Sequence, residues 1–387
     1  MGEDALAEAV QHHQAGRLKK AERLYREALK SNPSNSVALN LLGVLNYQGG
    51  RHSKAIQLLG KAVSISPDYA SAHFNLGNVY KYRGKLGQAE AAFERVVALT
   101  PNDAGAHGNL AIVLQEQGRH GEALGAFEKA AKLEPANAET HFNLANGLRL
   151  LDRQEAAMAA FQKALELRPD YAEAHTNLGN LRLGRGDYEQ AAASFMHAVE
   201  LRPDMAEAHN NLGSVHKSLH RFGDAEAAFR RAVELRPDFA EAHINLANTL
   251  FHQEDLDGAV AALDAALALD GEDIDTIRTL ASLWERANRL DQARPVIERG
   301  LRLAPEDEEL NLLAAKCERR DGNAGPAIAR LEKIDRAAGA RRRARPKGGA
   351  RGRPASAQPK NSSPEGERGD QPRGLVPQSR GVPFGRP

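Results

Sequence analysis

The chain has 387 residues, a formal net charge of +1 and a single cysteine, Cys317. One cysteine excludes an intramolecular disulfide, a disulfide-stabilised secreted scaffold and a zinc site made of cysteines. The N-terminal segment is acidic where a signal peptide would be basic, and nowhere do about 18 apolar residues follow one another. The sequence therefore predicts a soluble, cytoplasmic protein with no membrane association.

A period of 34 residues runs along the chain from its beginning. Alanine recurs in one register at positions 21, 55, 89, 123, 157, 191, 225, 259, 293 and 327. Proline recurs at positions 33, 67, 101, 135, 169, 203, 237 and 305, with Gly271 in the remaining place. A small residue recurs as Ala9, Gly43, Gly77, Ala111, Ala145, Gly179, Gly213, Ala247, Ala281 and Ala315. Such repetition is typical of a protein built from stacked supersecondary units.

One period, residues 172–205, predicts two short amphipathic helices. Apolar residues stand at helical spacing in each half, as Ala174, Leu178 and Leu181 and then as Ala191, Phe195 and Ala198. Neither helix can bury its apolar face alone, so the hairpins are expected to stack in one dimension. Gly179 and Ala191 are then small because two helices approach closely, and Phe195 fills the adjoining space.

The ends of these helices are marked by residues that stop or start a helix. Gly186 is expected to end the first helix, and Pro203 cannot continue the second one. Asp204, followed three residues later by Glu207, predicts a capping box at the start of the next first helix.

These residues resemble the tetratricopeptide repeat, which has 34 residues with small, Ala, aromatic and Pro residues at these places. The resemblance implies an all-α fold, a right-handed α-solenoid or superhelix of helix-turn-helix hairpins. Nine repeats are predicted at residues 2–35, 36–69, 70–103, 104–137, 138–171, 172–205, 206–239, 240–273 and 274–307. A degenerate tenth repeat or capping pair is expected at residues 308–340.

The phrases "HxNLGN" and "RPDxAEAH" are similar to the superhelical repeat domain of O-GlcNAc transferase and its bacterial relatives. Repeats 1 and 9 depart from this phrasing, with Ala7 and Thr279 where the middle repeats have asparagine. These end repeats are therefore expected to cap the stack rather than to bind.

Histidine forms a column at the fourth position of six repeats: His73, His107, His141, His175, His209 and His243. A metal array or proton relay is one interpretation, and packing between neighbouring hairpins is the other. Helices pack about 8–10 Å apart, whereas two imidazoles that share a zinc ion must each lie about 2.0–2.1 Å from it. Packing is favoured, and no metal site is expected. The i, i+4 pair His216 and His220 could bind a transition metal, although a solvent-facing helix surface is favoured.

Asparagine forms a second column, two positions further on: Asn75, Asn109, Asn143, Asn177, Asn211 and Asn245. One helical turn later stand Asn78, Asn146, Asn180 and Asn248. A buried amide would need several hydrogen-bond partners, and the neighbouring leucine already faces the core, so the column is expected to face outward. The resemblance implies that the first helices line the inside of the superhelix, where the corresponding asparagines of the O-GlcNAc transferase family bind the substrate backbone.

The function predicted from this column is the binding of extended peptide segments. Rungs about 10 Å apart would meet every third residue of a strand that advances about 3.3 Å per residue. Six rungs supply roughly 6–18 kcal/mol, and ordering the guest costs a similar amount, so partners would be weakly held. Side-chain contacts are expected from Lys81, Arg149 and Lys217, with Phe74 and Phe142 beside them. The alternative is that the amides only keep the groove hydrated or cap local backbone.

From Arg341 the chain carries 12 Lys and Arg against 3 Asp and Glu, a charge of +9, which leaves −8 for residues 1–340. Residues 341–387 are rich in Pro and Gly and nearly free of apolar residues, which predicts a disordered tail. The tail could contact nucleic acid but lacks aromatic residues for base stacking, so nucleic acid is not favoured as a partner.

No motif for nucleotide binding, hydrolysis or phosphoryl transfer occurs, so neither catalysis nor a cofactor is expected. The first hypothesis is a non-catalytic scaffold for other proteins, with self-association through the ends of the solenoid. The second is the targeting part of a protein O-glycosyltransferase or sulfotransferase system that lacks its catalytic domain. The tail is either native or stands in place of a lost domain.

Overall fold

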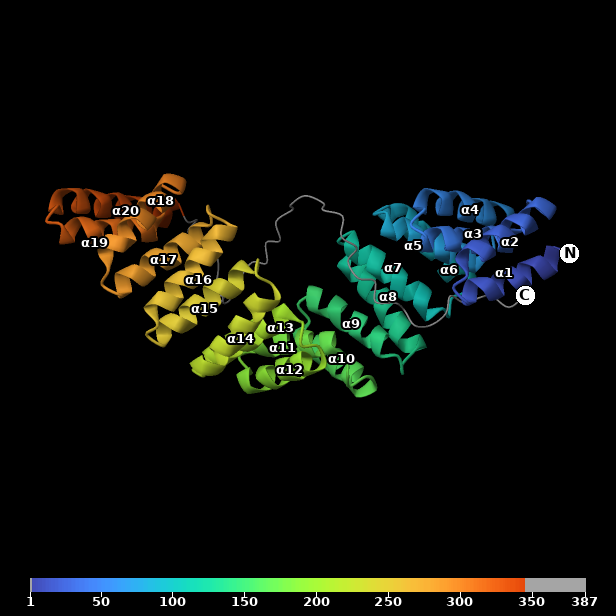
Figure 1. Cartoon of the computed structure of the whole chain (residues 1–387), viewed down its shortest axis with the longest axis horizontal. Coiled ribbons are helices and arrows are strands. Elements are labelled where there is room, and N and C mark those ends of the chain that lie inside the picture. The colour runs from blue at the N-terminus through green and yellow to red at the C-terminus, as the bar shows by residue number, and fades with distance from the viewer. Residues whose placement is uncertain (1, 345–387) are drawn as a thin grey trace. The chain divides into compact units, whose positions relative to one another are not determined.

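The computed structural model describes residues 2–344, and these residues form helices joined by short turns, without strands (Figure 1). The helices are α1 (Gly2–Gln14), α2 (Leu18–Ser31), α3 (Ser36–Gln48), α4 (His52–Ile65), α5 (Ala70–Tyr82), α6 (Leu86–Leu99), α7 (Ala104–Glu116), α8 (His120–Leu133), α9 (Ala138–Leu150), α10 (Gln154–Leu167), α11 (Ala172–Arg185), α12 (Tyr188–Leu201), α13 (Ala206–Ser218), α14 (Phe222–Leu235), α15 (Ala240–His252), α16 (Leu256–Leu269), α17 (Ile274–Arg286), α18 (Leu290–Leu303), α19 (Glu308–Arg320) and α20 (Ala324–Ala344). The all-α solenoid expected from the sequence is confirmed.

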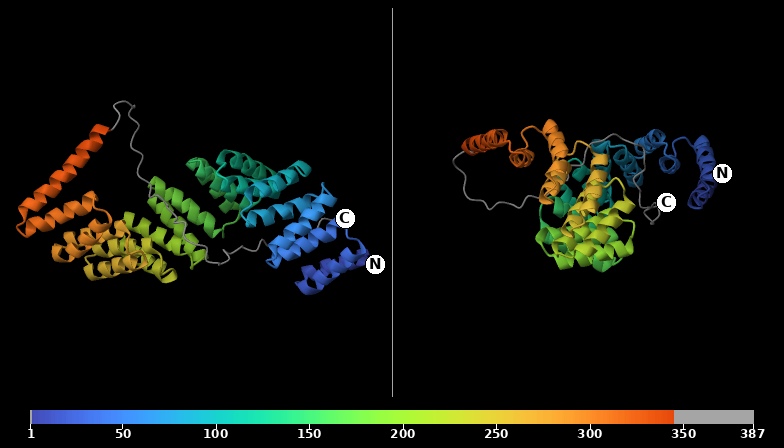
Figure 2. Two further views of the ribbon diagram at one scale, coloured as in Figure 1. Left: turned by 90° about the horizontal axis from the view of Figure 1, so that it is seen from above. Right: turned by 60° about the vertical axis from the view of Figure 1, so that its left-hand side comes forward.

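The chain divides into two units, and the boundary between Leu181 and Arg182 falls inside α11. In unit 1 the hairpins are α1/α2 through α9/α10, and in unit 2 they are α13/α14 through α19/α20. Within each unit the hairpins lie side by side, as all three views show (Figure 2). Each hairpin packs its apolar stripe against the next hairpin, because it cannot bury that stripe alone.

The two sides of each stack differ in how closely the helices are spaced. The first helix of one hairpin also contacts the first helix of the next hairpin. Helix α3 contacts α5, α7 contacts α9, α13 contacts α15, and α17 contacts α19. Second helices are not comparably close to one another in the described part of the chain. Each stack therefore curves toward its first helices, and we call this side the first-helix side.

The core repeats with the sequence. The periodic alanines are at most 1 % exposed, and large side chains one turn later, such as Phe93, Phe161 and Phe229, are fully buried. A Cβ atom on Gly77 would lie 2.9 Å from the ring of Phe93, and one on Gly213 would lie 2.7 Å from the ring of Phe229. The small residue of each first helix thus leaves room for the ring on the following helix.

The turn inside each hairpin has one residue in the left-handed conformation. Gly186 has φ +81°, directly after the end of α11, as predicted. The other described turns place Gly16, Gly50, Gly84, Gly118, Asp152, His220, Glu254, Asn288 and Gly322 there, all with positive φ. Only glycine adopts this conformation without steric cost, and a long side chain such as Glu254 is the least suited to it.

Replacing Glu254 by glycine is expected to stabilise unit 2 by about 0.5–1 kcal/mol, because a left-handed L-residue costs about 1–2 kcal/mol and glycine offsets part of this by its larger loss of entropy. The matched control is Gly84→Glu, which places the same side chain at the same turn position, with φ +66°. The control is expected to destabilise unit 1. Urea titrations followed by circular dichroism measure both, and a lower midpoint for Glu254→Gly would contradict backbone strain at this residue.

The predicted capping box of Asp204 and Glu207 is wrong. The N-cap of α13 is Met205, which makes no side-chain cap hydrogen bond. The helix begins one residue later than a box at Asp204 requires, so the two carboxylates turn to Arg202 and Arg236 instead. At other N-cap positions a side-chain cap does form, through Asn35, Asp103, Asn137, Asp255, Asp273 and Asp307, although Asp187 at the N-cap of α12 makes none.

The C-terminal end of the described chain differs from the tail boundary expected from the sequence. Helix α20 continues to Ala344, so residues 341–344, which the sequence assigns to the tail, are helical. Residues 345–387, the rest of the predicted tail, lie outside the described residues. None of the described helices combines the length and the apolar character needed to cross a membrane.

Candidate functional site

The histidine column ties each first helix to the turn before it. In all six repeats the imidazole Nε2 donates to the carbonyl oxygen of the proline six residues earlier, at 2.9–3.1 Å. The rings therefore fasten the turn that connects one hairpin to the next. Burial lowers the pKa of His209, which favours the neutral ring. Among the described residues no group of three or more His, Cys, Asp or Glu is placed to hold a metal ion.

The pair His216 and His220 does not share a helical face as predicted. Helix α13 ends at Ser218, and His220 is the left-handed residue of the turn, with φ +57°. Its ring contacts Phe222, which in turn stacks on His252 at 5.0 Å between ring centroids.

The asparagine column lies on the first helices α5, α7, α9, α11, α13 and α15, and all six side chains are half-buried. Four of them, Asn75, Asn109, Asn143 and Asn177, belong to unit 1, and Asn211 and Asn245 belong to unit 2. Among the residues one turn later, Asn180 is exposed and Asn78, Asn146 and Asn248 are half-buried.

Several of these amides bond to an asparagine on the preceding first helix. Asn75 Nδ2 donates to Asn40 Oδ1 at 2.9 Å, and Asn177 Nδ2 donates to Asn146 Oδ1 at 3.1 Å. Asn245 Nδ2 donates to Asn210 Oδ1, also at 3.1 Å. Each bond uses one of the two amide hydrogens and leaves the other hydrogen of the donor to other partners.

Asn143 differs from these, because its side chain makes no hydrogen bond to the described residues. The column thus partly joins neighbouring hairpins, while Asn143 keeps an amide that no described residue binds.

Two lysines of the predicted site belong to the same arrangement. Lys81 Nζ donates to Asn109 Oδ1 at 2.6 Å, and Lys217 Nζ donates to Asn245 Oδ1 at 3.1 Å. Burial lowers the pKa of both ammonium groups, because a desolvated cation is disfavoured. The third predicted cation, Arg149, is exposed on α9. The first-helix side therefore offers amides and two partly desolvated ammonium groups.

A cavity lies elsewhere on the first-helix side, in the predicted repeats 8 to 10. It has a volume of about 330 Å³ and is lined by Asn248, Phe251, Asp275, Arg278, Thr279, Ser282, Leu283, Arg286 and Glu309. Repeat 9, which was expected only to cap the stack, supplies most of this lining. These residues could not be found by following the asparagine column along the sequence, because Thr279 interrupts it.

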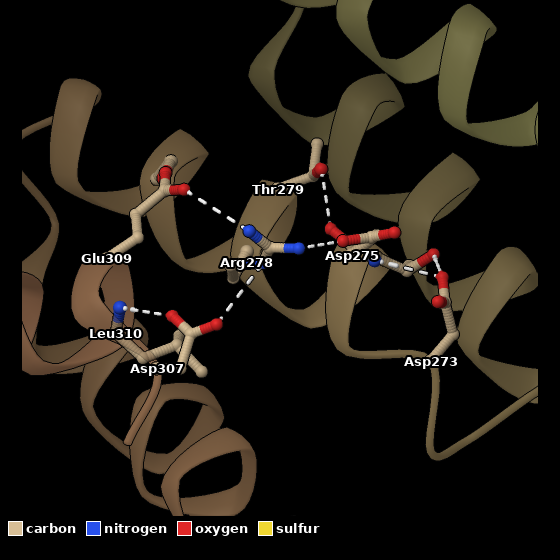
Figure 3. A network of polar contacts seen from close by, with 9 residues as sticks. Asp273, Asp275, Arg278, Thr279, Asp307, Glu309 and Leu310 are labelled. Carbon is tan, nitrogen blue, oxygen red and sulfur yellow. Dashed lines mark hydrogen bonds and ion pairs between the residues drawn. The ribbon is translucent and has the colours of Figure 1, made fainter. Parts of the chain in front are cut away.

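Arg278 is the centre of a polar network beside this cavity (Figure 3). Its guanidinium contacts Asp275, and lies 3.7 Å from Asp307 and 3.9 Å from Glu309. Asp307 also caps α19, since its Oδ1 accepts from the backbone N–H of Leu310 at 2.9 Å. The network joins α17 to α19 by charge as well as by packing.

The geometry defines the class of protein: an α-solenoid of helix hairpins whose first helices carry polar residues in register. Models of the tetratricopeptide repeat match residues 46–82 and 145–184, 74–131 and 214–274, 170–238, and 12–59 and 250–317. The chain belongs to the tetratricopeptide repeat family. Proteins that match only models of this repeat are typically non-catalytic scaffolds that bind other proteins.

Solved structures of several repeat proteins are similar to this chain. YrrB, described as a TPR protein with an unusual peptide-binding site, is 26% identical, with 49% of this chain and 97% of YrrB covered and a TM-score of 0.44. A chain of the APC/C hetero-tetramer Cut9-Hcn1 is 20% identical, with 72% and 55% covered and a TM-score of 0.50. Yeast Tom70 is 17% identical, with 86% and 91% covered and a TM-score of 0.40. No curated protein matches the chain.

Proposed function

We propose that this protein is a scaffold that binds extended segments of partner proteins on its first-helix side, through the amides of the asparagine column. The observation that supports the proposal is the register: one half-buried asparagine on the first helix of each of six successive repeats. An amide matches the C=O and N–H of a peptide bond and carries no charge that would select one sequence.

The hydrogen bonds inside the column refine this proposal. Bonds such as Asn75 to Asn40 hold the amides in a fixed orientation, which reduces the entropy that a guest must remove on binding. Lys81 and Lys217 point their ammonium groups at column amides, so they would also donate to the carbonyl oxygens of a guest. Binding of this kind is shared among many weak contacts, in keeping with the weakly held partners expected from the sequence.

The experiment replaces the four column asparagines of unit 1, Asn75, Asn109, Asn143 and Asn177, by alanine. Segments that contact the protein are first identified by crosslinking mass spectrometry in its own cells and then synthesised as labelled peptides. The variant is expected to bind them about tenfold more weakly or worse, since each lost hydrogen bond contributes about 0.5–1.5 kcal/mol. Fluorescence anisotropy measures the affinity, and circular dichroism checks that the helices persist.

A matched control replaces four exposed residues by alanine on the second helices of the same unit: Glu94, Glu128, Lys129 and Gln162. The control is expected to bind as the unchanged protein does. Equal affinity of the asparagine variant and the control for every crosslinked segment would reject the column as the binding site.

The repeated "HxNLGN" phrasing favours a second candidate, the targeting portion of an O-GlcNAc transferase-like or sulfotransferase system. Reading the DNA beyond the coding region in all three frames tests it, and a transferase domain there would support it. Self-association through the ends of the stack stays a prediction, which sedimentation over a range of concentrations tests.

A further inference from the structure

The cavity of about 330 Å³ in unit 2 continues the polar face of the asparagine column. Asn248 is part of its lining and stands three residues after Asn245, on the same face of α15. A strand that follows the column along unit 2 therefore reaches this cavity. The side chains around it decide which guest residue the cavity accepts.

The carboxylates of the cavity lining already have partners within the protein. Asp275 and Glu309 both lie against Arg278, and Ser282 Oγ donates to Glu309 Oε1 at 2.9 Å (Figure 3). A guest cation would have to compete with Arg278 for both carboxylates. The acidic side of the cavity is therefore not an open cation site.

The second guanidinium of the lining, that of Arg286, has no carboxylate partner among the described residues. The guanidinium carbon of Arg286 lies 4.1 Å from the centroid of the Phe251 ring, so the group is held over the ring by a cation–π contact. Within the described part of the chain Arg286 forms no ion pair and no hydrogen bond. Its N–H donors keep the fixed fork that matches a carboxylate. The amide of Asn248, on the same lining, also has no hydrogen bond among the described residues.

We propose that this cavity binds the carboxylate of an Asp or Glu side chain in an extended guest, with Arg286 as its cation and Asn248 as an additional donor. The four charged residues of the lining are two carboxylates and two guanidiniums, and Arg278 is shared by both carboxylates, which leaves Arg286 for the guest. This proposal rests on the proposed function in one respect only, that the guest is an extended segment. It adds a charge preference that the uncharged column lacks.

The test uses the full chain and three capped peptides of one length, rich in Ser, Thr and Ala, that differ only in a central Glu, Gln or Lys. A fourth peptide carries the Gln and a free C-terminal carboxylate. Each peptide carries the same fluorescent label, and fluorescence anisotropy gives the affinities. The Glu peptide is expected to bind about fivefold more tightly than the Gln peptide, and the difference is expected to shrink at high salt.

Variants of Arg286 test whether this residue causes the preference for the Glu peptide. Arg286→Gln is expected to abolish it, and Arg286→Lys, which keeps the charge but not the flat fork, is expected to retain part of it. Arg302→Gln, at an exposed arginine of α18, removes the same charge outside the cavity and is expected to change nothing.

Several results would overturn the proposal: equal binding of the Glu and Gln peptides, tighter binding of the Lys peptide, no binding of the Glu peptide, or a preference that survives in Arg286→Gln. A preference for the free C-terminal carboxylate over the Glu side chain would also overturn it. Failure of the asparagine column is a distinct outcome, since the alanine variant of unit 1 leaves this cavity unchanged.

Discussion

Replacing Phe229 by alanine is expected to lower the stability of unit 2 by about 3–5 kcal/mol, because the ring is fully buried and its loss leaves a cavity that packed helices cannot close. The ring lies against Gly213 of the preceding first helix, and Ala225, Leu246, Leu250 and Ala259 belong to the same core cluster. It therefore holds α14 both to its own hairpin partner α13 and to the next hairpin. The effect should appear as a lower midpoint of urea unfolding, followed by the fluorescence of Trp284.

The control for this substitution is Met196→Ala, which shortens an exposed apolar side chain on the second helix α12 of the same unit. A surface change of this kind is expected to stay within about 0.5 kcal/mol. Equal midpoints for the two variants would show that the ring of Phe229 does not hold the hairpins together. In a repeat protein the loss can be confined to neighbouring hairpins, so hydrogen exchange should show the weakest protection in α13 to α15.

The fold could be predicted from the sequence because its main constraints repeat every 34 residues. The alanine register indicated where helices approach, Gly186 indicated where the first helix of a hairpin ends, and the periodic prolines indicated where the hairpins end. Capping was harder to predict, because a cap depends on which single residue starts the helix. Asp204 stands one residue too early, whereas Asp103 and Asp307 stand at the N-cap and make the bond.

The candidate site could be predicted only in part. The sequence placed the asparagine column on the first helices, but it could not show that Asn75, Asn177 and Asn245 bond to neighbouring rungs. Such bonds depend on the distance between consecutive hairpins, which the period alone does not give. The cavity was missed for a related reason: Arg278 and Arg286 occupy different repeat positions from the column, and only the packing of α15, α17 and α19 brings Phe251, Arg286 and Glu309 around one space.

The second large effect concerns the small residue opposite the ring. A leucine in place of Gly213 is expected to destabilise unit 2 by about 1–3 kcal/mol or more, because even its Cβ atom would lie 2.7 Å from the Phe229 ring. Repeat 5 combines Ala145 with Phe161 in one core cluster, which shows that helices can separate enough to admit a single methyl group. Leucine adds three further carbon atoms, which no such adjustment accommodates.

The contact between Gly213 and Phe229 can also be tested by exchanging the large and the small side chain. In Gly213→Leu/Phe229→Ala the leucine would occupy the space that the ring leaves. The double variant is therefore expected to be more stable than the sum of the single variants predicts, by at least about 1 kcal/mol, since the two sites are in contact. Urea unfolding of the four proteins gives this coupling energy. Strict additivity would mean that the ring and the glycine do not share one space, and the room needed by the ring would then not explain why a small residue recurs in every first helix.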